Sequence, residues 1–155
     1  MKKLLLATVL SVLGFAAGAQ PLPILFNPGD PHSAALGGTG VALELAENSP
    51  SKAVLLQAPF LSGRRLIEFW MQDGMHFPTE AKPFPSEERI ARLTCPVAAI
   101  HGTDDNVVPF SQGEALYAAA PQKAGFTAVP AAGHNDLLAV LGPFRYKAIV
   151  EFLLA

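Results

Sequence analysis

The sequence predicts an α/β fold, with a mostly parallel sheet and flanking helices. Residues 53–56 and 97–100 are continuous apolar runs without alternating polar residues. Such runs are typical of strands that are buried on both faces of a parallel sheet. Helical patterns separate these runs from each other and from a third strand predicted at residues 125–129. This alternation indicates βαβ units, which produce parallel sheets.

The remaining elements follow from local signals taken along the chain. Asn48-Ser49-Pro50 ends a helix, and Ser111-Gln-Gly-Glu114 matches a capping box that opens one. Pro143 suits the first turn of a last helix, whose apolar side chains share one face. Strands are expected at residues 24–26, 53–56, 97–100 and 125–129. Helices are expected at residues 40–47, 64–72, 86–92, 111–120 and from 143 onward. The buried face of the last helix is expected to consist of Tyr146, Ile149, Val150 and Leu153.

The first 19 residues have the pattern of a secretory signal peptide and are expected to lie outside the fold. Lys2 and Lys3 precede an apolar stretch from Leu4 to Phe15, and Ala17-Gly18-Ala19 gives the small-x-small cleavage pattern. The apolar stretch is short for a bilayer, so no stable membrane span is expected after cleavage. We therefore expect export to the periplasm or outside the cell. Retention through an uncleaved N-terminal anchor is the alternative.

Composition narrows the classes of function. The formal net charge is −2 and no basic stripe is present, so nucleic acid is not expected as a partner. Half of the residues are hydrophobic, which favours a packed domain over disorder. The single cysteine, Cys95, adjoins an apolar strand and is interpreted as a small buried side chain. No metal-ligand spacing, phosphate loop or dinucleotide fingerprint occurs, so no cofactor is implied.

Two loops carry the chemistry. Each of two motifs lies at the carboxyl end of a predicted strand, where α/β sheets place their active sites. The motifs are Ile100-His-Gly-Thr-Asp-Asp-Asn-Val-Val-Pro-Phe110 and Ala132-Gly-His-Asn-Asp136. They resemble the acid loop and the histidine loop of the α/β-hydrolase superfamily, closest to its "α/β-hydrolase domain-containing" and serine-aminopeptidase-like members. The resemblance covers roughly residues 32–155 and assigns Asp105 and His134 to a catalytic triad in the family's chain order. Asp104 is the alternative to Asp105 as the acid of the triad.

The nucleophile departs from the family pattern. The family elbow is Gly-x-Ser-x-Gly, whereas Ser33 has Pro31 and Ala35 at the glycine positions. Ungapped spacing from the following helix places the serine slot at Leu36, so Ser33 requires an insertion. If Ser33 is the nucleophile, the resemblance makes the Ala34 N–H an oxyanion donor, with a second donor expected near residues 27–30. Alternatively, Ser33 is a loop or helix-capping serine.

The predicted protein is therefore a truncated α/β-hydrolase fold at residues 20–155, because only one short strand precedes the nucleophile. The resemblance implies an exported serine hydrolase acting on an ester, thioester or amide bond of a small-molecule acyl substrate. A catalytically inactive binding module or a non-functional fragment is the alternative. The unpaired sheet edge predicts self-association.

Other candidate residues have weaker support. Residues 61–93 form a variable segment or lid that contains His76, which has no partner in the sequence. Phe69-Trp70-Met71, Phe77 and Phe84 are expected to line an acyl pocket or to belong to the core. His101 is interpreted as a packed side chain at the end of its strand.

Overall fold

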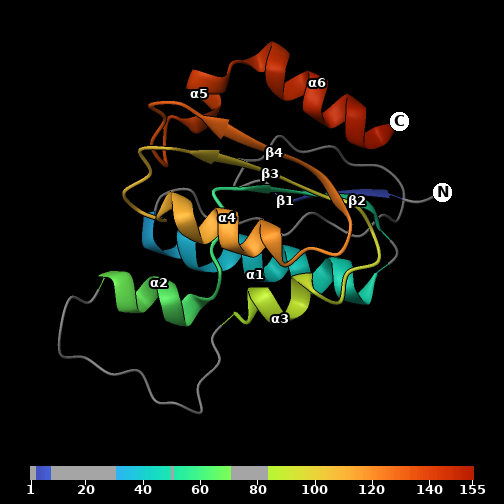
Figure 1. Ribbon diagram of the computed structural model, residues 1–155, viewed down its shortest axis with the longest axis horizontal. Helices are drawn as coiled ribbons and strands as arrows, with labels where there is room; N and C mark the ends of the chain where they lie inside the picture. The colour runs from blue at the N-terminus through green and yellow to red at the C-terminus, as the bar shows by residue number, and fades with distance from the viewer. Residues whose placement is uncertain (1–2, 8–30, 50, 71–83) are drawn as a thin grey trace, which may run out of the picture.

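The structure is a computed structural model that describes residues 3–7, 31–49, 51–70 and 84–155, with only the backbone described at 3–7 and 31–37. Four parallel strands form one sheet in the order β1-β2-β3-β4 (Figure 1). The strands are β1 (Lys3–Ala7), β2 (Ser51–Gln57), β3 (Val97–Gly102) and β4 (Lys123–Val129). The α/β class and the parallel sheet predicted from the sequence are confirmed.

Helices cover both faces of the sheet (Figure 1). On one face lie α1 (Pro31–Asn48), α3 (Ser86–Ile90) and α4 (Phe110–Ala118), with α2 (Gly63–Trp70) farther out. On the opposite face lie α5 (Leu137–Leu141) and α6 (Pro143–Leu154).

The central strands contribute to two separate cores because successive side chains of a strand point to opposite faces. Val54 and Leu56 of β2 pack on the α1, α3 and α4 side. Ala53 and Leu55 pack on the α5 and α6 side. All six residues of β3 are buried. The absence of alternation in these runs is thus explained by helices on both faces.

The last helix was predicted correctly. Leu153 of α6 is buried, and Tyr146, Ile149 and Val150 are partly buried against the same core. The sequence did not predict α5, which occupies part of the connection between the histidine loop and α6. Its Leu137 and Leu141 are buried in this core, so tertiary packing stabilises a helix too short to be stable alone.

Two helix starts differ from the predictions. Helix α1 begins at Pro31 instead of residue 40, so residues expected to form a nucleophile turn are helical. Proline favours the first turn of a helix, and Ala34, Ala35 and Leu36 are strong helix formers. The capping box was wrong, because Pro109 is the N-cap of α4 without a side-chain cap, and Ser111 lies inside the helix.

The N-terminal strand lies within the predicted signal peptide, which was expected to be outside the fold. Strand β1 pairs in parallel with β2, with Leu4 opposite Ala53 and Leu6 opposite Leu55. A chain cleaved after Ala19 would lose this strand and leave β2 at the edge of the sheet. Residues 24–26, predicted as a strand, lie outside the described residues. No helix in the described part of the chain has the length and apolarity needed to cross a membrane.

Candidate active site

Two loops meet at the carboxyl edge of the sheet. The acid loop, residues 103–109, follows β3, and the histidine loop, residues 130–136, follows β4. Because β3 and β4 are parallel neighbours, their carboxyl ends lie at the same edge of the sheet. The sequence placed Asp105 and His134 in these two loops, so the sheet topology brings the two residues together.

Backbone contacts fix one loop against the other. The Thr103 N–H donates to the Val129 carbonyl at 3.1 Å, and the Asp104 N–H donates to the Ala132 carbonyl at 3.0 Å. A Cβ at Gly102 would lie 2.2 Å from the Ala132 oxygen, so only glycine permits this approach. The two loops therefore form one unit whose geometry does not depend on long side chains.

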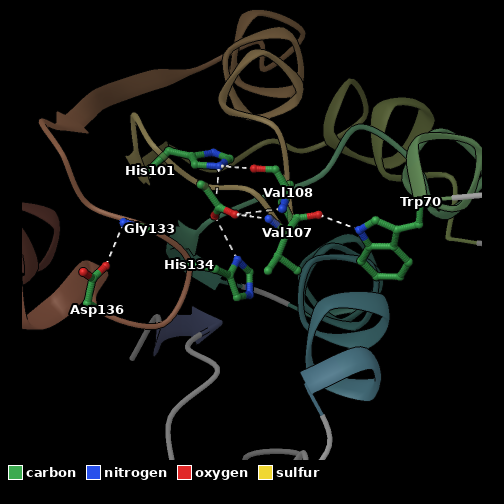
Figure 2. A network of polar contacts seen from close by, with 8 residues as sticks. Trp70, His101, Val107, Val108, Gly133, His134 and Asp136 are labelled. Carbon is green, nitrogen blue, oxygen red and sulfur yellow. Dashed lines mark hydrogen bonds and ion pairs between the residues drawn. The ribbon is translucent and has the colours of Figure 1, made fainter. Parts of the chain in front are cut away.

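Asp105 is the centre of this unit. Its side chain is completely buried, and its Oδ1 accepts hydrogen bonds from the N–H groups of Val107 at 2.9 Å and Val108 at 2.8 Å. Its Oδ2 accepts a hydrogen bond from His134 Nδ1 at 2.8 Å. These contacts are the dashed lines that converge between His101 and His134 in Figure 2. The predicted hydrogen bond between His134 and Asp105 is thus present.

The environment of Asp105 favours its charged form. Burial by itself raises the pKa of a carboxyl group, but His101, His134 and the Val108 N–H all favour the anion. Together they hold the pKa of Asp105 well below its usual range. The carboxylate is therefore a permanent acceptor at neutral pH.

His134 is suited to proton transfer. Its Nδ1 faces a carboxylate, which can only accept, so the proton of the neutral ring lies on Nδ1. The lone pair of the neutral ring is then on Nε2, which points away from Asp105 (Figure 2). The side chain is 14% exposed, so it is partly buried but reachable. This is the arrangement required of a general base oriented by a carboxylate.

The structure distinguishes Asp105 from its rival, Asp104. The Asp104 side chain is exposed and accepts a hydrogen bond from the Thr103 hydroxyl at 3.0 Å. It makes no contact with His134 among those found in the described part of the chain. Asp105 is therefore the carboxylate that pairs with the histidine.

The described residues do not show the predicted nucleophile, Ser33, beside Asp105 and His134. Ser33 and Ala34 lie in the first turn of α1, where only the backbone is described. Their helical conformation differs from the sharp strand-to-helix turn that presents a nucleophile in G-x-S-x-G proteins. The assignments of Ser33 as nucleophile and Ala34 as oxyanion donor stay predictions, and residues 27–30 lie outside the described residues.

The structure describes four of the other candidates, namely Phe69, Trp70, Phe84 and His101. The Trp70 Nε1–H donates to the Val107 carbonyl at 2.8 Å, which ties α2 to the acid loop. Phe69 is 48% exposed, and Phe84 packs edge-on against Phe60. His76, Met71 and Phe77 lie outside the described residues. Sequence reasoning missed the contact of His101 with the acid, although its place four residues before Asp105 was a usable signal.

Curated proteins with similar sequences share one description. No protein-family model matches the chain. It is 36% identical over 105 residues to the α/β-hydrolase domain-containing protein aho-3 of Caenorhabditis elegans, covering 64% of this chain and 29% of the relative. It is 37% identical to the human α/β-hydrolase domain-containing protein 17C, again over 64% of this chain and 29% of the relative. The chain thus spans less than a third of the length of these relatives.

Solved structures with a similar fold include an esterase domain and a peptidase. The esterase domain of a Rhodothermus marinus protein matches with a TM-score of 0.52 and 19% identity, covering 73% of this chain and 56% of that one. The acylaminoacyl peptidase of Pyrococcus horikoshii matches with a TM-score of 0.58 and 16% identity, covering 76% of this chain and 22% of that one. At these identities the matches concern the fold alone. Taken with the sequence relatives, they show that the chain has an α/β-hydrolase fold in a shortened form.

Proposed function

We propose that the protein is an exported serine hydrolase that cleaves an ester, thioester or amide bond of a small acyl substrate. The observation that carries this proposal is the 2.8 Å hydrogen bond from His134 Nδ1 to the buried Asp105 carboxylate. Structural packing alone does not require an ionised carboxylate at the carboxyl edge of a sheet, with a partly exposed imidazole beside it. Charge relations of this kind are concentrated at catalytic sites.

The proposed reaction is an acyl transfer in two steps. The Ser33 hydroxyl oxygen attacks the acyl carbon while its proton passes to His134 Nε2, and Asp105 stabilises the resulting imidazolium. The imidazolium then protonates the leaving alcohol, thiol or amine, which departs and leaves an acyl-serine ester. Water hydrolyses that ester with His134 again as base, which returns the serine and the neutral ring. The Ala34 N–H is the proposed donor to the oxyanion in both steps.

The alternative function is a hydrolase-like module that binds a ligand without turning it over. The observation that favours it is the helical backbone at Ser33, which lacks the strained turn of a nucleophile elbow. In that case Asp105 and His134 retain their geometry but no nucleophile reaches His134 Nε2. The two functions differ in whether a serine of this chain becomes covalently modified.

Labelling with a fluorophosphonate probe distinguishes the two functions. Such probes react with serines that a neighbouring base activates: the serine oxygen bonds to phosphorus, fluoride leaves, and a phosphonyl-serine ester remains. We expect labelling of the intact protein at Ser33, located by peptide mass spectrometry, and loss of labelling in Ser33→Ala and His134→Ala. Ser111→Ala is the matched control, because Ser111 is an exposed serine in α4 and its replacement should leave labelling unchanged.

Turnover provides the second measurement. We expect slow hydrolysis of a short-chain p-nitrophenyl ester, with most of the rate lost in Ser33→Ala and His134→Ala and retained in Ser111→Ala. The losses from Ser33 and His134 should not add, because the two side chains act as one unit. Equal rates in wild type and Ser33→Ala would exclude Ser33 as the nucleophile. Absence of both labelling and turnover would reject the hydrolase and leave the inactive binding module or the non-functional fragment.

A further inference from the structure

His101, like His134, lies against Oδ2 of the Asp105 carboxylate. Its side chain is completely buried at the end of β3. Its Nε2 lies 3.0 Å from the Val108 carbonyl oxygen and 3.4 Å from Asp105 Oδ2. Both neighbours are acceptors, so Nε2 must carry a proton. The stronger hydrogen bond goes to Val108, and the positive end of the same N–H lies against the carboxylate.

The Nδ1 side of the His101 ring is packed against other parts of the protein. Nδ1 is buried and has no hydrogen-bond partner among the described residues. A Cβ at Gly113 would lie only 2.0 Å from Nδ1, so helix α4 packs its backbone directly against the ring. The Phe110 ring packs edge-on at 5.5 Å between centroids. The ring therefore has no space to rotate or to withdraw from the carboxylate.

These contacts close a circuit around the acid. Asp105 Oδ1 accepts from the Val108 N–H, the Val108 carbonyl accepts from His101 Nε2, and His101 Nε2 faces Asp105 Oδ2. Rotation of the carboxylate about its last bond would break the bonds to Oδ1 and move Oδ2 away from both histidines. The circuit thus defines one orientation of Oδ2, the one that receives His134 Nδ1.

We infer that His101 is a positioning residue that acts through Asp105, holding Oδ2 in line with His134 Nδ1 and so fixing the tautomer of His134. The effect of His101 on catalysis rests on the proposed hydrolase function. His101 touches neither the reacting serine nor the acyl group in this assignment. Asp105 consequently has two histidine neighbours of opposite tautomer, with the proton on Nε2 of His101 and on Nδ1 of His134.

Tautomers are read directly from long-range nitrogen–proton correlation spectra of the ¹⁵N-histidine-labelled protein. In the wild type we expect the Nε2–H form for His101 and the Nδ1–H form for His134. A proton on Nδ1 of His101 would overturn the inference, whatever the variants do. This measurement requires no activity, so it separates the inference from the proposed hydrolase function.

Substitution of His101 tests the positioning role. His101→Met removes the donor while keeping an unbranched apolar side chain, and His101→Gln places an amide N–H near the position of Nε2. We expect His101→Met to convert part of His134 to the Nε2–H form and to lower kcat on the order of tenfold with KM little changed, the effect of one lost hydrogen bond of moderate strength. His101→Gln should restore both.

The outcomes are distinct. A folded His101→Met protein whose His134 keeps the Nδ1–H form would overturn the inference. A change of tautomer that His101→Gln does not reverse would assign the effect to packing and would also overturn it. If the tautomers behave as expected but neither wild type nor variants hydrolyse the ester, the inference stands and the proposed function fails.

Discussion

Replacement of Asp105 by asparagine is the most informative single change to this site. The variant keeps the shape of the side chain, and its amide oxygen still accepts from the Val107 and Val108 N–H groups. It replaces Oδ2 with an NH₂ group, which donates where the carboxylate accepted. His134 Nδ1 must then become an acceptor, so the proton of its neutral ring moves to Nε2.

The magnitude follows from the replacement of a charge-assisted hydrogen bond by a weaker, neutral one. A hydrogen bond to a charged group contributes about 1.5–3 kcal/mol, and the contact between His134 and Asp105 is one such bond. We expect the free energy of unfolding to fall by about 2 kcal/mol, which lowers the Tm by about 4–8 °C for a domain of this size. If the hydrolase assignment is correct, kcat should fall on the order of 10⁴-fold, because the wrong tautomer faces the nucleophile.

Urea denaturation followed by circular dichroism measures the stability change, and Asp104→Asn is the matched control. That variant makes the same change of charge one residue away, on an exposed side chain whose contact is the Thr103 hydroxyl. Its stability should change by no more than about 0.5 kcal/mol. Equal effects of the two variants, together with an unchanged His134 tautomer, would refute the reasoning.

Four further predictions concern the protein as a whole. The pKa of Asp105 in the folded protein lies below its unfolded value of about 3.9, so the carboxylate stabilises the fold above about pH 3.9 and this stabilisation is lost as the pH falls below it. The difference in urea midpoint between wild type and Asp105→Asn should therefore be smaller at about pH 3 than at about pH 6. Gly113→Ala should lower the free energy of unfolding by about 1–3 kcal/mol, because the new Cβ clashes with His101 and this outweighs a gain of up to about 1 kcal/mol in helix propensity. Glu114→Ala, on the exposed face of the same helix, should be nearly neutral. Equal melting temperatures of the two variants would contradict the close packing of His101 on α4. Intact-mass measurement of exported material should give a chain that starts at Gln20, and a chain starting at Met1 would reject cleavage. Light scattering of that material should show self-association through the edge strand exposed by cleavage, and a stable monomer would show that the sheet closes without it.

The sequence alone determined the class of the fold and which two loops meet at one edge of the sheet. Continuous apolar runs are typical of strands covered on both faces, so residues 53–56 and 97–100 were predicted to be buried strands between layers of helices. Parallel neighbours place their carboxyl ends together, so Asp105 and His134 were predicted to meet at one edge. Local signals also gave α6 its start at Pro143 and its buried face.

Only the tertiary structure decided which groups surround the acid. Asp104 and Asp105 are adjacent and chemically identical, and the pairing with His134 depends on how the turn after β3 directs each side chain. The circuit through His101 and Val108 depends on the distance between β3 and α4, which is set by Gly113 and is invisible to local patterns. The conformation of the Ser33 segment was likewise a balance between helix propensity and a strained turn, and in the structure the helix prevailed.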